Sequence, residues 1–136
     1  MAKKGYDELL TMMKGSARKK PDDREHRLQC ECVRLFRLLY PEYRNRLFAV
    51  PNGGRRDAVT GARLKAEGVL AGVADLILLV KNRQYGALLL ELKTETGRQS
   101  SSQKEWEKDV TATEEYKYVV IRSVGEFCKA VNDYLK

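Results

Sequence analysis

Three charged residues, Asp75, Glu91 and Lys93, stand at the ends of two short apolar segments. The segments, 75–81 and 87–93, are rich in Leu, Ile and Val and are separated by a polar turn, which is typical of buried strands. A buried charge is unfavourable unless it is paired or bound to a metal ion. The three residues are therefore the first candidates for a site with chemistry.

Side chains alternate between the two faces of a strand, so Glu91 and Lys93 are expected on the same face. If the two segments pair antiparallel across their short connection, Asp75 comes to lie beside both. Two carboxylates this close repel each other unless one is protonated or a cation lies between them. A site of this kind suits Mg²⁺ or Mn²⁺, which can polarise a phosphoryl oxygen and lower the pKa of a bound water, while the lysine could orient that water. The alternative is a structural ion pair at a strand end, because a D…ExK pattern alone is short and loose.

The elements around these strands follow from apolar spacing. Asp23 to about Tyr40 is predicted to be an amphipathic helix that ends at Pro41. At about 100° per residue, Glu25 lies near the centre of its apolar face and Glu31 roughly 100° away, among arginines. We therefore expect Glu31 in a surface salt-bridge ladder and Glu25 pointing toward the sheet, at the rim of the carboxylate site.

The remaining patterns complete an alternating order of helices and strands. They predict a strand over 46–50, a helix over 57–67 closed by Gly68, a helix capped by Ser101 or Ser102, a strand over 118–122 and a last helix opened by a capping box from Ser123 to Glu126. The order is helix, strand, helix, strand, strand, helix, strand, helix. It predicts an α/β sandwich in which helices flank a small mixed sheet.

Length and patterning predict one domain over residues 23–136, preceded by a basic arm or linker over residues 1–22. The helical spacing of Tyr6, Leu9, Leu10 and Met13 predicts a short amphipathic helix within the arm. One interpretation is that the arm touches DNA or a second subunit, and the other is a frayed basic tail.

The composition favours a polyanionic partner. The chain of 136 residues has 26 Lys and Arg against 19 Asp and Glu, a formal net charge of +7, which points to nucleic acid, although a generically basic protein is the alternative. No apolar run approaches the roughly 20 residues of a membrane span, and the first residues lack the apolar core of a signal peptide, so we expect a cytoplasmic protein. Three cysteines without a C-x-x-C pair and a single histidine, His26, argue against a disulfide framework, a zinc ribbon and a Ser-His triad.

A loop of sequence PNGGRR follows the first predicted strand. Its glycines leave the backbone open to close approach, and Asn52, Arg55 and Arg56 add an amide and two guanidiniums. Such a loop can receive phosphates through backbone N–H groups and bidentate arginines. A solvated turn is the alternative interpretation.

Several segments together resemble a known family. GVADLILL followed by LLLELK and RQSSSQKEW, with EHRLQ, PNGGRR and LKAEGVLAGVAD before or around them, resembles the VRR-NUC branch of the PD-(D/E)xK nuclease superfamily, which has a restriction-endonuclease-like fold. The resemblance extends from Glu25 to Phe127. Two departures are Ala74, where relatives have proline, and residues 113–115, where relatives often have a glycine.

The resemblance implies roles for individual residues. Asp75 and Glu91 would be metal ligands together with the backbone carbonyl of Leu92, and Lys93 would be the catalytic lysine. Glu25 is similar to a first-helix glutamate that assists the metal. Gln103 resembles the family glutamine that follows the third motif, and we expect it to be catalytic. Apart from the resemblance, we expect DNA contacts from Asn52, Arg55 and Arg56 of the PNGGRR loop and from Lys65 and Arg98.

The function that the resemblance implies is a metal-dependent phosphodiesterase acting on DNA, with Mg²⁺ as cofactor and Mn²⁺ as a substitute. Stand-alone VRR-NUC proteins look like homodimeric, structure-selective endonucleases similar to Holliday-junction resolvases, found in bacterial or phage-infected cells. Three alternatives stay open: a non-catalytic DNA-binding module, a flap nuclease and a restriction-type nuclease. The filled D…ExK motif counts against the first, and the lack of a separate base-reading domain counts against the last.

Overall fold

The structure is a computed structural model that describes residues 23–51 and 58–136. Its elements are α2 (Asp23–Leu39), the short helix η1 (Pro41–Arg46), β1 (Leu47–Ala49), α3 (Ala58–Ala66), β2 (Leu76–Leu78), β3 (Ala87–Leu92), α4 (Ser101–Thr111), β4 (Tyr116–Ile121) and α5 (Val124–Leu135). The order matches the predicted one, with η1 added after Pro41. The predicted arm, 1–22, lies outside the described residues.

The four strands form one mixed sheet in the order β1-β2-β3-β4. β1 pairs antiparallel with β2, β2 pairs antiparallel with β3, and β3 pairs parallel with β4. Leu76 pairs with Leu90, so Asp75, just before β2, lies opposite Glu91. The predicted hairpin is therefore confirmed, and so is the α/β class with its small mixed sheet.

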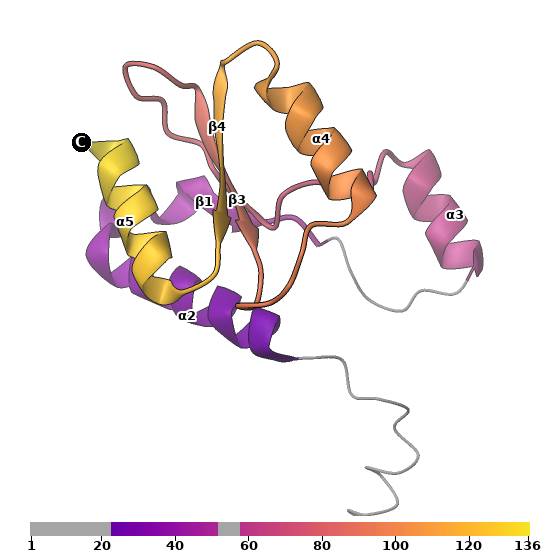
Figure 1. Cartoon of the computed structure of the whole chain (residues 1–136), viewed down its shortest axis with the longest axis horizontal. Coiled ribbons are helices and arrows are strands. Elements are labelled where there is room, and N and C mark those ends of the chain that lie inside the picture. The colour runs from indigo at the N-terminus through magenta and orange to yellow at the C-terminus, as the bar shows by residue number, and fades with distance from the viewer. Residues whose placement is uncertain (1–22, 52–57) are drawn as a thin grey trace, which may run out of the picture.

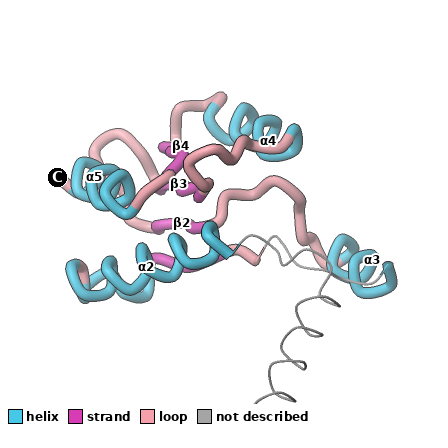
Figure 2. Tube along the Cα trace, turned by 60° about the horizontal axis from the view of Figure 1, so that its bottom comes forward, coloured by secondary structure: helices cyan, strands magenta, loops and turns pink. Residues whose placement is uncertain are grey.

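Helices cover the sheet unequally on its two faces (Figures 1 and 2). On one face, α2 and α5 pack over the side chains of Leu88, Leu90 and Leu92, all fully buried, in a large apolar cluster that includes Phe36. On the other face, α4 covers a much smaller cluster built around Leu89. In Figure 2, α3 lies apart from the sheet.

Local turns and caps explain where the elements end. Gly68 has a φ of +103° just past α3, which confirms the predicted left-handed cap. The cap of α4 is Ser100, and the prediction of Ser101 or Ser102 was wrong, because only Ser100 lies three residues before Gln103 and so forms the reciprocal capping box. In the described part of the chain, no helix is long and apolar enough to cross a membrane.

Candidate active site

The candidate site lies at the end of β3, a strand whose six residues are all buried. Glu91 has no exposed surface, and Lys93, two residues later, is 8% exposed. They are the buried charged side chains of the described residues. Alternation places both on the same face of the sheet, as predicted, and this is the face that α4 covers. Their burial cannot be explained by packing alone, because both charges lose hydration there.

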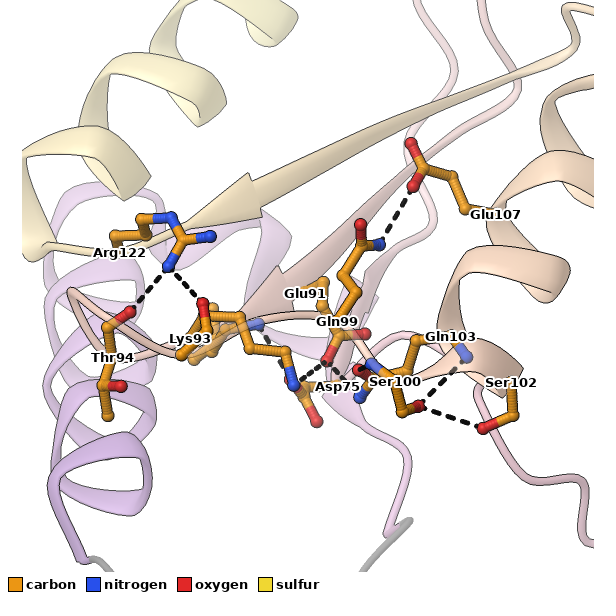
Figure 3. Close-up of polar contacts among 12 residues, drawn as sticks. Asp75, Glu91, Lys93, Thr94, Gln99, Ser100, Ser102, Gln103, Glu107 and Arg122 are labelled. Carbon is orange, nitrogen blue, oxygen red and sulfur yellow. Dashed lines mark hydrogen bonds and ion pairs between the residues drawn. The ribbon is translucent and has the colours of Figure 1, made fainter.

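Asp75 is held beside this strand end by two backbone contacts. Its Oδ2 accepts a hydrogen bond from the Leu92 N–H at 2.8 Å, and its carbonyl accepts one from the Val50 N–H at 2.9 Å (Figure 3). The Asp75 carboxylate thus accepts the hydrogen bond that the backbone carbonyl of a paired strand would otherwise accept from β3. The side chain of Asp75 is fixed by β3 while its backbone is fixed by the end of β1.

Glu91 is surrounded by polar groups from α4 and β4 and from the residues just before β2 and just after β3. Its Oε1 accepts a hydrogen bond from Gln103 Nε2 at 3.0 Å and lies 3.9 Å from Lys93 Nζ. Its Oε2 accepts one from the Tyr118 hydroxyl at 3.2 Å. The carboxyl also shares a hydrogen bond with Asp75. Four of the five predicted catalytic residues, Asp75, Glu91, Lys93 and Gln103, therefore meet in one place (Figure 3).

The proximity of two carboxyls changes their chemistry. Burial, followed by the hydrogen bond and the negative charge of Asp75, raises the pKa of Glu91 from 4.5 to about 8, against the opposing effects of Lys93 and Tyr118. Near neutral pH the metal-free pair therefore holds a proton between its oxygens. A cation placed between the oxygens would replace that proton. Burial and the charge of Glu91 also raise the pKa of Tyr118, so its hydroxyl stays a hydrogen-bond donor.

The donor set suits a hard divalent cation. Two carboxylates provide the charge, and the strand edge that presents the Leu92 N–H to Asp75 also carries the Leu92 carbonyl. Within residues 23–51 and 58–136, no three His, Cys, Asp or Glu side chains are grouped closely enough to hold a metal ion. A bound ion would thus take two side-chain ligands and complete its shell with water and substrate, as Mg²⁺ commonly does.

Glu25 does not join Asp75 and Glu91 in such a group. It lies half-buried in the first turn of α2, on the helix that covers the opposite face of the sheet. Its predicted role in assisting the metal stays a prediction. Glu31 is exposed, as expected, but no ion pair of the described residues includes it.

Gln103 connects the site to the start of α4. Its Oε1 accepts a hydrogen bond from the Ser100 N–H at 2.8 Å, while its own N–H donates to Ser100 Oγ at 3.2 Å. The same side chain thus caps the helix with its oxygen and holds Glu91 with its nitrogen. Because both roles fix the rotamer, Gln103 is a rigid donor rather than a mobile one.

Three positioning residues were missed by the sequence analysis. Tyr118, already described, receives a hydrogen bond from Gln99 Nε2 at 3.1 Å, and Gln99 also donates to Glu107 at 2.9 Å. Arg122 donates to the carbonyls of Thr94 at 2.8 Å and Gly97 at 2.6 Å, and so fixes the loop that leaves the site. Strand alternation could have placed Tyr118 on the α4 face, but its position beside Glu91 depends on the parallel register.

The predicted DNA contacts are only partly described. Lys65 on α3 and Arg98 in the loop before α4 are both exposed. Asn52, Arg55 and Arg56 lie outside the described residues. The roles of these five residues in DNA binding stay predictions.

Comparison with known proteins gives one informative result. No family model matches the chain, and no curated protein matches it. A solved structure described as a "VRR_NUC domain protein" matches with a TM-score of 0.69 over 82% of this chain and 87% of that one, at 22% sequence identity. This chain has the VRR_NUC fold. The resemblance drawn from the sequence motifs is thereby confirmed at the level of the fold.

Proposed function

We propose that this protein is a nuclease that hydrolyses DNA phosphodiester bonds with Mg²⁺, or Mn²⁺ in its place. The observation that carries the proposal is the meeting of Asp75 with Glu91 and Lys93 at the end of β3, where both Glu91 and Lys93 are buried. A protein that used this strand only for its core would gain nothing from a carboxylate without exposed surface. The VRR_NUC fold supports the same proposal independently.

The residues divide the chemistry among them. When bound, a divalent ion polarises a phosphoryl oxygen and lowers the pKa of a coordinated water. Asp75 and Glu91 would hold the ion, and their shared proton would leave when it binds. The Lys93 ammonium, 3.9 Å from Glu91, would orient a water and stabilise the negative charge that develops on phosphate. Gln103 and Tyr118 keep Glu91 in position.

The finer substrate assignment is a branched DNA, such as a Holliday junction, cut by a homodimer. The net charge of +7 supports a polyanionic substrate. Two copies of the site would allow paired cuts in two strands, whereas one copy would nick a single strand. The protein is expected to act in the cytoplasm of a bacterial or phage-infected cell.

A non-catalytic DNA-binding module is the second candidate function, since the basic chain would bind DNA even without the metal. It does not explain why Lys93 is held beside a buried carboxylate. A flap or restriction-type nuclease would share the site and differ only in the DNA that it cuts.

The decisive experiment compares cleavage of duplex, flap, fork and four-way-junction DNA in Mg²⁺ by wild type, Lys93→Ala and Asp75→Asn. Loss of either group should slow cleavage by at least about a hundredfold, the usual cost of one electrostatic contact in a transition state. Lys104→Ala and Asp109→Asn, exposed on α4, are matched controls that should cut normally. Wild type that binds DNA but cuts none of these substrates would leave the non-catalytic module as the function.

Glu25 has a test of its own. Glu25 is half-buried while Glu31 is exposed, and at about 100° per residue Glu25 falls on the apolar face of α2. Glu25→Gln should therefore reduce cleavage far more than Glu31→Gln, at least about tenfold more if Glu25 takes part in general acid–base or metal assistance. Single-turnover cleavage at saturating Mg²⁺ measures this. Equal effects of the two substitutions would remove Glu25 from the site.

A further inference from the structure

The outer side of α2 carries a basic groove that the proposed active site does not use. The groove has a volume of about 530 Å³, and its lining includes Arg34 and Arg37 from α2 and Arg44 from η1. By about 100° per residue, Arg37 lies roughly 140° around the helix from Cys32, which is buried against the sheet. The groove therefore faces away from the core. All three arginines are exposed.

The charge of this groove is not neutralised locally. The rest of its lining consists of His26, Gln29, Cys30, Val33 and Leu38, so no carboxylate lines it. In the part of the chain that the structure describes, no ion pair joins any of the three arginines to an acid. The cations of α5 behave differently, because Lys129 and Lys136 both pair with Asp133. Three adjacent guanidiniums without counter-charges repel one another and fit an anionic partner.

The length and place of the groove fit a nucleic-acid duplex. From His26 to Arg37 the helix rises about 16 Å, a distance along which a duplex presents about ten phosphate charges. α2 packs against β3, and its N-terminal half lies toward the end of β3 where the candidate site stands (Figure 1). A rod-shaped anion lying along the outside of α2 would therefore lead toward that edge of the sheet.

We propose that Arg34, Arg37 and Arg44 form a second DNA-binding surface, which holds the phosphates of a duplex arm outside the active site. This inference rests on the proposed function, because it takes the anion to be an arm of the DNA substrate. Guanidiniums bind phosphate oxygens bidentately, and the backbone contact carries no sequence information. Such a surface favours branched or long DNA over a short duplex that fills only the active site.

The test uses a variant with Arg34→Gln, Arg37→Gln and Arg44→Gln, and a control with Lys81→Gln, Arg83→Gln and Lys108→Gln, three exposed cations on the hairpin turn and α4. Each removes three charges from a chain of net charge +7. Binding to a labelled four-way junction is measured in EDTA by fluorescence anisotropy over a salt series. Thermal melting of both variants shows that they fold.

Loss of three phosphate contacts should weaken junction binding by at least about tenfold and make the slope of log K against log salt less negative by roughly 2 to 3, since each contact contributes about 0.9. The control should change the slope much less. Equal slopes for the two variants, while wild type still cuts DNA, would overturn this surface and leave the nuclease proposal standing. If the triple arginine variant binds the junction normally but no longer binds phosphatidylserine vesicles, the groove binds lipid headgroups and the proposed DNA surface is also overturned. Wild type that neither binds nor cuts DNA would refute the proposed function itself.

Discussion

The two faces of β3 come from the same strand but have opposite compositions. Toward α2 and α5 the strand presents Leu88, Leu90 and Leu92, all fully buried in the large apolar cluster. Toward α4 it presents Leu89 and Glu91, followed by Lys93. Leu89 lies in a small apolar cluster, and Glu91 accepts hydrogen bonds from Gln103 and Tyr118. One face is apolar and fully packed, and the other buries charged groups, which lose hydration there. A single strand can do both because its side chains alternate.

The neighbouring leucines on the two faces give the largest expected difference. Leu90→Ala should lower the free energy of unfolding by about 3–4 kcal/mol, because it leaves a cavity in a fully packed cluster. Leu89→Ala should cost about 2 kcal/mol, since its cluster is smaller and its surroundings are partly open. Urea unfolding of the two variants measures this. A greater cost at Leu89 would mean that the α4 face is the principal core.

The polar face should also respond to pH. The pKa of Glu91 is raised from 4.5 to about 8 in the folded protein. Its protonation therefore contributes fully to stability below about pH 4.5, and this contribution is lost as the pH rises through about 8. Metal-free wild type should therefore lose about 1–2 kcal/mol over this range relative to Glu91→Gln, which keeps a neutral side chain. The free energies of unfolding of both proteins are measured at about pH 5 and pH 9 in EDTA. Comparing the change in wild type with that in Glu91→Gln removes the effect of titrating groups that the two proteins share.

Magnesium provides the second arm of the same test. A cation that replaces the shared proton should restore most of the stability lost at high pH in wild type, and should do little for Glu91→Gln. Parallel pH profiles of the two proteins would show that the carboxyl pair is not destabilising. Equal stabilisation of both by Mg²⁺ would place the ion elsewhere.

Much of this asymmetry could be predicted from the sequence, because it depends on local rules. Alternation put Glu91 and Lys93 on one face, and the short connection between the strands brought Asp75 to them. The S-x-x-Q pattern that makes Ser100 the cap of α4 was also present in the sequence, and the neighbouring serines obscured it. Features that depend only on one hairpin or one helix turn can therefore be predicted from the sequence.

What could not be predicted depends on contacts between distant segments. Tyr118 reaches Glu91 only because β4 pairs with β3 in a particular parallel register, which the sequence does not encode locally. Arg122 fixes the Thr94 loop for the same reason. The place of Glu25 depends on how the whole of α2 packs on the sheet, so a helical wheel gives its direction but not its distance from the carboxyl pair.

The turn between α4 and β4 gives the smallest expected effect on the polar face. Glu114 has a φ of +60°, a left-handed conformation that costs an ordinary residue roughly 1 kcal/mol. It lies within the segment 113–115, where the resemblance leads one to expect a glycine. Glu114→Gly should therefore raise the free energy of unfolding by about 0.5–1 kcal/mol, because glycine adopts this conformation without strain.

Glu114→Ala separates the backbone effect from the loss of charge, since alanine removes the exposed carboxylate and keeps the strained Cβ. Thermal melting should rank the proteins with glycine above both alanine and wild type. Alanine that stabilises as much as glycine would attribute the gain to charge alone. Cleavage should be unaffected by either substitution, because the turn lies at the opposite end of β4 from the Ile121 that pairs with the active-site end of β3. A stabilised turn with unchanged cleavage would show that the strain at Glu114 makes no contribution to activity.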